Sequence, residues 1–346
     1  MNDLTRRAAT AAHRARDVAA GVHWTPRWVR AEDNPPDPDP VDGARLFAVL
    51  GSYEDEDVVE ATVRNAFAQG VERVYLVDNA STDDTVARAV GAGAELVEVF
   101  ATTGPQESIR NLLMNTAVWR VSSNEPAEHV WWLWLDDDEF PHGPQGATIR
   151  QYLDRLDRRF RVVGAQYYQH YPHQKPEYLR GFHPLDFQPL CEPFSQPAIP
   201  RCGSGHYKHP LQRFDRSGPF VVAENGFHTG RANDRAQLVE PTTGIVTHHF
   251  QYREETLTRH RLARHYGAMA RRDTHLAPAD VTDGARRLRN LDAIYAQRWD
   301  EVDNQRHIRG DRGVSPRPWP DLTAYPEPPR WYGADDLAGA LASWTR

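Results

Sequence analysis

Residues 132–140 read Trp-Leu-Trp-Leu-Asp-Asp-Asp-Glu-Phe, so an apolar run ends directly in four carboxylates. The run from Val130 to Leu135 has the composition of a strand buried on both faces. Repulsion makes it costly to ionise several carboxylates at one point, and a divalent cation removes that cost. Hard oxygen ligands suit Mg²⁺ or Mn²⁺. Because alternate residues of an extended segment face the same way, Asp136 and Asp138 are the expected pair of ligands. A helix N-terminus or a solvated acidic turn is the alternative.

The acidic stretch belongs to a series of apolar runs that alternate with helix-like segments. This rhythm with short links predicts an α/β fold, a mostly parallel central sheet with helices on both faces. Ligands of such sheets bind beyond the carboxyl ends of the strands, where Asp78, Asp136 and Asp138 are all expected. The other expected strands are 46–50, 74–77, 96–100 and 161–168, and the expected helices are 54–70, 83–91, 106–120 and 145–158.

Composition excludes several classes of protein. The 346 residues carry a net charge of −7. Nucleic-acid-binding domains usually have an excess of basic residues, so this composition argues against that class. Two cysteines cannot form a disulfide framework. The longest apolar run is too short to span a membrane, and the Ala/Arg-rich N-terminus has no apolar signal core. A cytoplasmic protein is therefore expected. The chain has an excess of histidines, 16 in all, which could be catalytic residues or ligands. Its only lysines are Lys175 and Lys208.

Two further motifs point to the same sheet edge. In VYLVDNASTDDT (74–85), Asp78 follows an apolar run, where it could accept hydrogen bonds from a base or a ribose. The simpler interpretation of this motif is a helix cap at Thr82 or Asp83. In QESIRN (106–111), the guanidinium of Arg110 is well shaped to bind a diphosphate, although most helical arginines are simply exposed.

Taken in order, the motifs Tyr53-Glu54, LVDNASTDDT, SIRN and LWLDDDEF resemble those of the family 2 glycosyltransferases, which have a GT-A fold. The resemblance covers residues 45–170 well and continues weakly to about 255. It is closest to the branch whose acidic motif reads Leu-Asp-x-Asp-Glu-Phe. One departure is Gly51-Ser52-Tyr53-Glu54, where the common pattern is Pro-x-Tyr-Asn-Glu.

The resemblance implies a metal-dependent, inverting glycosyltransferase. It would move a sugar from a nucleoside-diphosphate sugar to an acceptor hydroxyl on a small molecule or glycan. The base of the donor (UDP, GDP or dTDP) and the oligomeric state stay open. A metal-dependent hydrolase that uses the Asp/His cluster is one alternative, and a catalytically silent carbohydrate-binding relative is another.

The resemblance also implies roles for single residues. Asp78 would contact the base or ribose, and Glu54, Arg110, Asp136 and Asp137 would help bind the nucleotide and its phosphates. Asp136 and Asp138 would hold Mn²⁺ or Mg²⁺, with His249 of GIVTHHFQ completing the metal shell. The alternation of a strand puts His248 on the other face.

The general base and the acceptor pocket are expected later in the chain. Asp215, Glu224 and Asp234 are the candidates for the base, with Glu224 preferred, and His228 resembles a position near the acceptor. Aromatic residues between 165 and 190 would stack on a sugar or pack the loop. The resemblance divides the chain into an N-terminal helix with a Pro-rich linker (1–44), a nucleotide-sugar-binding half (45–168), an acceptor-binding half (169–252) and an Arg-rich helical extension (253–346).

Overall fold

The computed structural model describes eleven stretches and three isolated residues of the chain. Only the backbone is described at 28–31, 107–108, 193, 221–224, 229–232, 238–240, 264–272 and 317–318. The helix expected near the N-terminus lies outside the described residues, except that Trp28–Ala31 forms strand β1. The described residues are 28–31, 35–101, 107–172, 184, 188, 190–193, 208–216, 221–224, 229–232, 238–241, 244–272, 290–302, 313 and 315–318.

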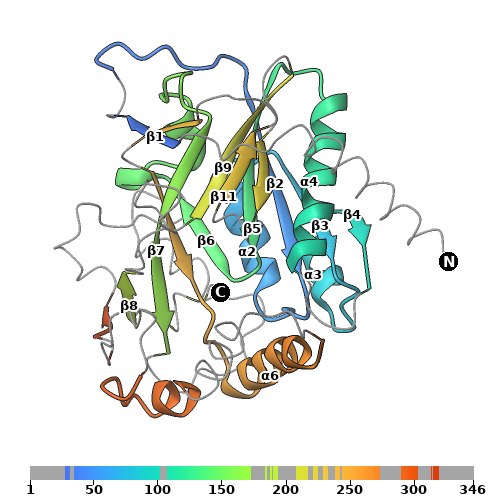
Figure 1. Cartoon of the computed structure of the whole chain (residues 1–346), viewed down its shortest axis with the longest axis vertical. Coiled ribbons are helices and arrows are strands. Elements are labelled where there is room, and N and C mark those ends of the chain that lie inside the picture. The colour runs from blue at the N-terminus through green and yellow to red at the C-terminus, as the bar shows by residue number, and fades with distance from the viewer. Residues whose placement is uncertain are drawn as a thin grey trace.

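A mixed sheet forms the centre of the molecule (Figure 1). Its first half is parallel, in the order β4-β3-β2-β5, and comprises β2 (Arg45–Ser52), β3 (Arg73–Asp78), β4 (Glu95–Val99) and β5 (His129–Asp136). Strand β9 (Lys208–Asp215) pairs antiparallel with β5 and with β7 (Val162–Tyr171). Beyond them lie β8 (Leu190–Pro193) and β14 (Arg317–Pro318).

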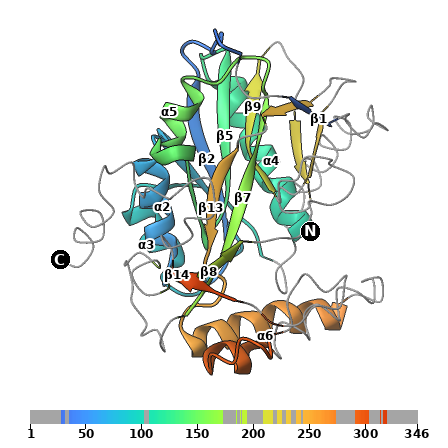
Figure 2. The same cartoon turned by 90° about the vertical axis from the view of Figure 1, so that its left-hand side faces the viewer.

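The buried strands have apolar side chains on both faces, as the sequence runs predicted. Leu46, Ala48 and Leu50 of β2 pack toward α2 (Val59–Ala68), α3 (Thr85–Gly91) and α5 (Ile149–Leu153), while Phe47 and Val49 pack toward α4 (Glu107–Asn124). Helices therefore cover both faces of the sheet (Figure 2). This arrangement confirms the predicted α/β fold, a central sheet with helices on both faces.

Two expected elements differ in detail. The helix predicted at 145–158 is a 3₁₀ turn at Pro144–Gly146 followed by the short α5, because Asp157 instead bridges to Pro40. The acidic stretch does not simply continue β5: Asp137 and Asp138 form a turn into β6 (Glu139–His142). Strand β6 pairs antiparallel with β13 (Ile245–His249), which also pairs parallel with β7.

The described C-terminal residues are mainly helical, as predicted. Helix α6 (Glu255–Arg272) and the helical residues 290–295 lie across the end of the sheet where β5 finishes (Figures 1 and 2). They share a small core with the end of β7, made of Tyr171, Tyr252, Leu262, Leu291 and Ile294. Two-stranded ribbons complete the fold: β1 with β12 (Leu238–Pro241), and β10 (Val221–Glu224) with β11 (Thr229–Ala232). Within the described residues, no helix is both long and apolar enough to cross a membrane.

Candidate active site

The turn between β5 and β6 places the acidic residues at the carboxyl end of the parallel half of the sheet. Two side chains of α2 hold this turn from one side: Thr62 donates a hydrogen bond to the carbonyl of Asp137, and Asn65 donates to the carbonyl of Pro141 at 3.0 Å. Residue pairing between β6 and β13 brings His249 directly opposite Glu139. Long-range strand pairing therefore creates the site, because these two residues are far apart in the chain.

Among the described residues, Asp138, Glu139 and His249 form a group that could hold a metal ion. One ligand atom from each lies within 4.8 Å of the others, and the Asp138 Oδ1 lies 3.5 Å from the His249 Nε2. Gln169 fixes the imidazole: its NH₂ group donates to two backbone carbonyls, so its Oε1 accepts from the His249 Nδ1 at 2.9 Å. The Nε2 is then the ring nitrogen that faces Asp138, and the carboxylate and imidazole donors of this group fit a divalent cation.

Asp136 has a different environment from that of Asp138. Its Oδ1 lies 2.9 Å from the Nη1 of Arg110, and its Oδ2 accepts a hydrogen bond from the Nζ of Lys208 at 2.7 Å. Burial alone would raise the pKa of Asp136, but these two cations lower it to about 2. Asp136 is therefore ionised and neutralised by protein side chains. Its expected role as a metal ligand beside Asp138 stays a prediction.

Arg110 reaches this position because the penultimate residue of β2 is a glycine. A Cβ atom on Gly51 would lie 2.7 Å from the Cδ of Arg110 and 2.9 Å from the sulfur of Met114. Gly51 is also the residue of β2 that pairs with Asp136. The absence of a side chain at Gly51 therefore makes room for Arg110, whose side chain is 24% exposed.

Lys208 is a buried cation that the sequence reasoning did not connect with the site. Its ammonium lies between Asp136 and Glu139, and its Nζ also lies 5.5 Å from the centre of the Tyr167 ring. Burial alone would lower the pKa of Lys208, but the two carboxylates raise it. Tyr167 donates a hydrogen bond to the Oε2 of Glu139 at 2.5 Å, so this aromatic residue supports the site. One signal was available: only two of the 41 basic residues are lysines.

Two arginines from the region of α6 bind the far side of the acidic turn. Arg261 contacts both the Oδ1 of Asp55 (3.2 Å) and the Oδ2 of Asp138 (3.1 Å), and Arg253 lies between Asp55 and Asp57. Burial alone would raise the pKa of Asp138, but His249, Arg261 and Arg253 hold it well below its usual range. Asp138 is thus ionised, with one oxygen facing the arginines and the other facing His249.

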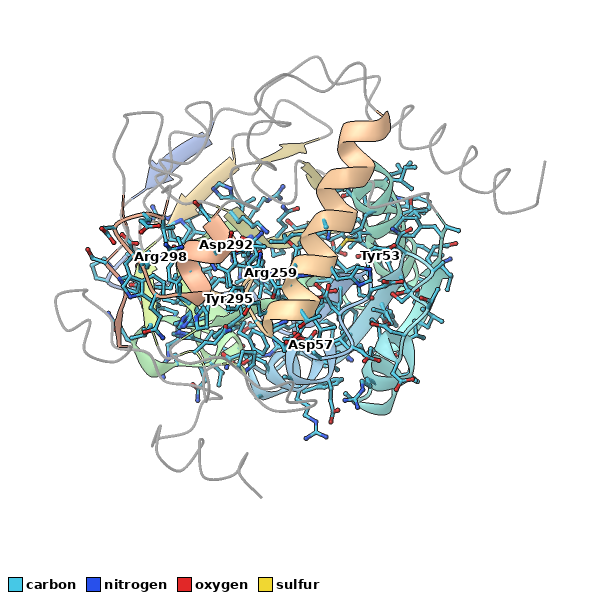
Figure 3. The ribbon with its side chains drawn as sticks, turned by 90° about the horizontal axis from the view of Figure 1, so that it is seen from below. Tyr53, Asp57, Arg259, Asp292, Tyr295 and Arg298 are labelled. Carbon is cyan, nitrogen blue, oxygen red and sulfur yellow. The ribbon has the colours of Figure 1, made fainter. Side chains whose placement is uncertain are left out.

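Asp137 has the opposite electrostatic environment. Burial, Asp55 and Asp138 together raise the pKa of Asp137 well above its usual range. Its Oδ2 accepts a hydrogen bond from the backbone N–H of Tyr53 at 3.3 Å. Figure 3 shows this end of the molecule from below, with α6 and the residues around Tyr295 lying across it and Asp57 beside α6. The expected role of Asp137 in nucleotide binding stays a prediction.

Asp78 and Glu54 lie in the neighbouring loops. Asp78 is buried and accepts hydrogen bonds from the Ser52 hydroxyl (3.2 Å), the Ser81 hydroxyl (2.6 Å) and the Ser81 N–H (2.8 Å). Glu54 has a φ of 53° and accepts a hydrogen bond from Thr82 at 2.9 Å. Asp78 therefore fixes the loop after β3, and the nucleotide contacts expected of both residues stay predictions.

The two adjacent histidines of β13 face opposite sides, as the alternation predicted. His249 faces Asp138 and Gln169, whereas His248 is fully buried between His142 and His170. Burial lowers the pKa of His142 to about 4 and that of His170 to about 3. Both rings are therefore neutral at physiological pH, and His248 has a place in the core.

The candidates for the general base lie in different places. Glu224 ends β10, and its side chain lies outside the described residues; His228 and Asp234 lie outside them altogether. Asp215 is opposite His129, the first residue of β5, and so is at the other end of that strand from Asp136. The assignment of Glu224 as the base stays a prediction.

No protein-family model matches the chain, and no curated protein sequence matches it. Solved structures do resemble it in part. Glucosyl-3-phosphoglycerate synthase from Mycobacterium tuberculosis, in complex with Mn²⁺, UDP and glucosyl-3-phosphoglycerate, is 15% identical with a TM-score of 0.35, over 72% of this chain and 90% of that one. Mannosyl-3-phosphoglycerate synthase from Rubrobacter xylanophilus is 17% identical with a TM-score of 0.33, over 68% and 78%.

Proposed function

We propose that the protein is a metal-dependent, inverting glycosyltransferase that moves a sugar from a nucleoside-diphosphate sugar to an acceptor hydroxyl. The observation that carries the proposal is the pair formed by Asp138 and His249 at the carboxyl end of β5, next to Arg110. This is the edge of a parallel sheet at which nucleotides bind, and the pair presents two electron-pair donors toward one point.

At this edge, some residues would hold the metal ion and another would bind the diphosphate. Asp138 and His249, with Glu139, would hold Mn²⁺ or Mg²⁺, which supplies Lewis-acid stabilisation of the departing diphosphate. Arg253 and Arg261 keep Asp138 ionised and hold its Oδ2, which leaves the Oδ1 facing His249. Arg110 is partly exposed and would donate hydrogen bonds to a phosphate oxygen, for which its planar guanidinium is suited.

Proton transfer from the acceptor needs a carboxylate on the other side of the sugar. We assign this role to Glu224, on a ribbon that lies beside α4 and β9. A Glu224→Gln variant should lose turnover and keep nucleotide binding. If this variant stays active, the general base is another carboxylate.

The proposal is tested with a panel of UDP, GDP and dTDP, each with and without Mn²⁺. A ligand that binds only the folded state raises its stability, so one nucleotide should raise the melting temperature in a metal-dependent way. Hydrolysis of the matching nucleotide-sugars then identifies the donor. A panel without any metal-dependent shift would contradict the proposal, and metal-dependent cleavage of a simple ester without a nucleotide would favour the hydrolase alternative.

A further inference from the structure

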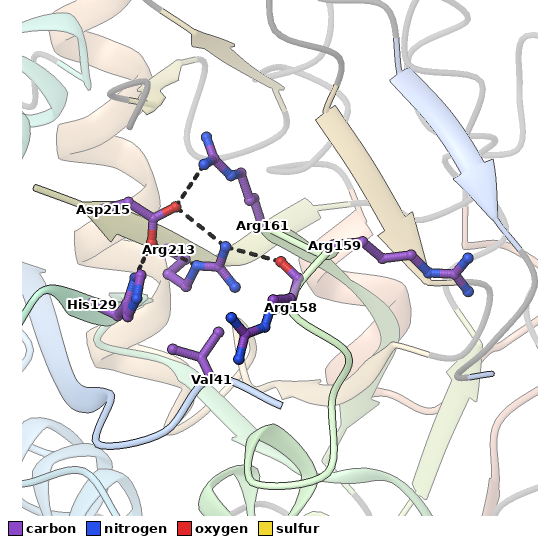
Figure 4. Close-up of a pocket in the computed structure, with 7 residues that line it drawn as sticks. All are labelled: Val41, His129, Arg158, Arg159, Arg161, Arg213 and Asp215. Atoms are coloured by element: carbon purple, nitrogen blue, oxygen red, sulfur yellow. Dashed lines mark hydrogen bonds and ion pairs between the residues drawn. The ribbon is translucent and has the colours of Figure 1, made fainter. Parts of the chain in front are cut away.

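A hollow of about 380 Å³ lies at the opposite end of β5 from the acidic turn. Its wall contains four arginines, one histidine and one carboxylate, drawn in Figure 4: Arg158, Arg159, Arg161, Arg213, His129 and Asp215. Since β5 runs from His129 to Asp136 with a rise of about 3.3 Å per residue, the two ends are about 23 Å apart. The hollow is therefore separate from the candidate active site.

Asp215 lies at the centre of this basic cluster. It is buried, and its two oxygens are contacted by Arg213 through Nε (2.7 Å) and Nη2 (3.2 Å), by Arg161 through Nη2 (3.0 Å) and by His129 through Nδ1 (2.7 Å). One negative charge thus serves two guanidinium groups that are permanently positive. This leaves a positive charge that Asp215 does not compensate.

The arrangement of the arginines is rigid at its base and open at its rim. Arg213 is buried and also donates to the carbonyls of Arg158 (3.0 Å) and Phe160 (3.2 Å). Arg161 is 25% exposed, and within the described part of the chain its side chain pairs with Asp215 through Nη2. Its Nε and Nη1 donors are therefore open to a ligand. Because the side chains of Arg213 and Asp215 are already fixed, little side-chain entropy is lost when an anion binds.

A second guanidinium at the rim, that of Arg158, makes exposed contacts with Asp39 and with the carbonyl of Pro40 (3.3 Å). Arg158 pairs with Asp39 at 2.7 Å, and both side chains are more than half exposed. Such a pair contributes little to stability, so a more strongly charged partner can replace Asp39.

We infer that this hollow binds the phosphate group of a phosphorylated small molecule, with Arg161 as its principal contact and Arg158 as a second. Guanidinium groups bind phosphate oxygens through charge-assisted, often bidentate hydrogen bonds. The volume lies within the range of small-molecule sites, so the hollow has room for an organic group attached to the phosphate. The inference does not depend on the proposed function, because the site lies at the other end of the sheet.

Titration with inorganic phosphate, in the absence of divalent ions and nucleotide, tests this inference. Chloride at matched ionic strength separates specific binding from screening. Saturable binding, measured by calorimetry and as a rise in melting temperature, is expected for the wild-type protein. Arg161→Gln should weaken binding about tenfold or more, because it removes the charge of the main contact while Arg213 and His129 still hold Asp215. Arg161→Lys, which keeps the charge without the fork, should lie between the two.

A matched control and a second source of phosphate complete the experiment. Arg73→Gln removes an exposed arginine that pairs with Glu95, two strands away from β5 and outside the lining of the hollow, and it should bind phosphate like the wild type. Phosphatidylcholine vesicles with and without phosphatidic acid show whether the phosphate belongs to a lipid headgroup, since only a headgroup site makes the protein sediment with the acidic vesicles. The inference would be overturned if neither inorganic phosphate nor the acidic vesicles bound saturably. It would also be overturned if Arg161→Gln bound phosphate as tightly as the wild type.

Discussion

The two ends of β5 differ in their balance of charge, although they belong to the same strand. At the carboxyl end, the carboxylates of Asp55, Asp57, Asp136, Asp138 and Glu139 make ion pairs with Arg110, Lys208, Arg253 and Arg261. At the amino end, one carboxylate serves two arginines and a histidine. The carboxyl end is thus nearly neutral before any ligand arrives, whereas the amino end has a positive excess.

This difference shows how the charged side chains at each end of β5 are balanced by their partners. The carboxyl end accommodates these carboxylates because cations from several elements, including α4, β9 and α6, are shared among them. The Oδ2 of Asp138 faces Arg261, whereas its Oδ1 faces the imidazole of His249. We expect a metal ion there and an anion at the amino end, and the following predictions test that contrast.

The largest effect is expected from Asp138→Asn. It removes the charged ligand at the point where Asp138 and His249 meet, and a metal contributes several kcal/mol of transition-state stabilisation. Transfer or donor hydrolysis should therefore fall by about two orders of magnitude or more, with loss of Mn²⁺ binding measured by electron paramagnetic resonance. Asp154→Asn, which changes an exposed carboxylate, is the control and should behave like the wild type. Unchanged Mn²⁺ affinity in Asp138→Asn would place the metal elsewhere.

Lys208→Met should strongly destabilise the carboxyl end. It leaves Asp136 and Glu139 buried without their shared ammonium, and breaking a buried ion pair costs about 3–5 kcal/mol. Urea unfolding measures this loss. Arg73→Met removes a cation from an exposed pair and should cost less than about 1 kcal/mol. Equal losses in the two variants would mean that burial of the pair is unimportant.

Asp215→Asn should have a smaller effect that depends on pH. Burial alone would raise the pKa of Asp215, but its hydrogen bonds and ion pairs with Arg213, His129 and Arg161 lower it. Hydrogen bonds to a charged group contribute about 2 kcal/mol, and an amide keeps part of them. Because the folded pKa is below the unfolded value of about 4, the advantage of the wild type should be complete above pH 4. It should shrink as the pH falls through the lowered pKa. A difference in unfolding free energy that stays constant down to pH 2 would contradict this account.

The smallest effect on stability is expected from Arg161→Gln. This side chain is partly exposed and has a single ion pair, so its loss should change the unfolding free energy by about 1 kcal/mol or less. A larger loss would show that Arg161 is a structural residue like Arg213. A small loss together with weaker phosphate binding would sharpen the contrast between the two ends.

Local sequence patterns were sufficient for the parallel half of the fold. Apolar runs with short links predicted β2 to β5, and period-2 alternation placed His248 and His249 on opposite faces. The same alternation did not describe residues 136–138, because a turn at Asp137 and Asp138 separates β5 from β6. Lys208, Arg253 and Arg261 were missed as site residues because each is brought in by an element distant in the chain. Glu139 was missed because the turn before β6 changes which acidic side chains face His249.

The sequence by itself therefore determined the class of the fold, the sheet edge that collects the carboxylates, and the chemistry available there. These properties depend on neighbouring residues, whose spacing fixes which side chains are buried and which follow a strand. Only the tertiary structure decided which carboxylate is neutralised by Lys208 and Arg110 and which faces His249. Those contacts depend on pairing between β6 and β13, between β5 and β9, and on the position of α6. Charges near each other in space, and not in sequence, set the ionisation of each group.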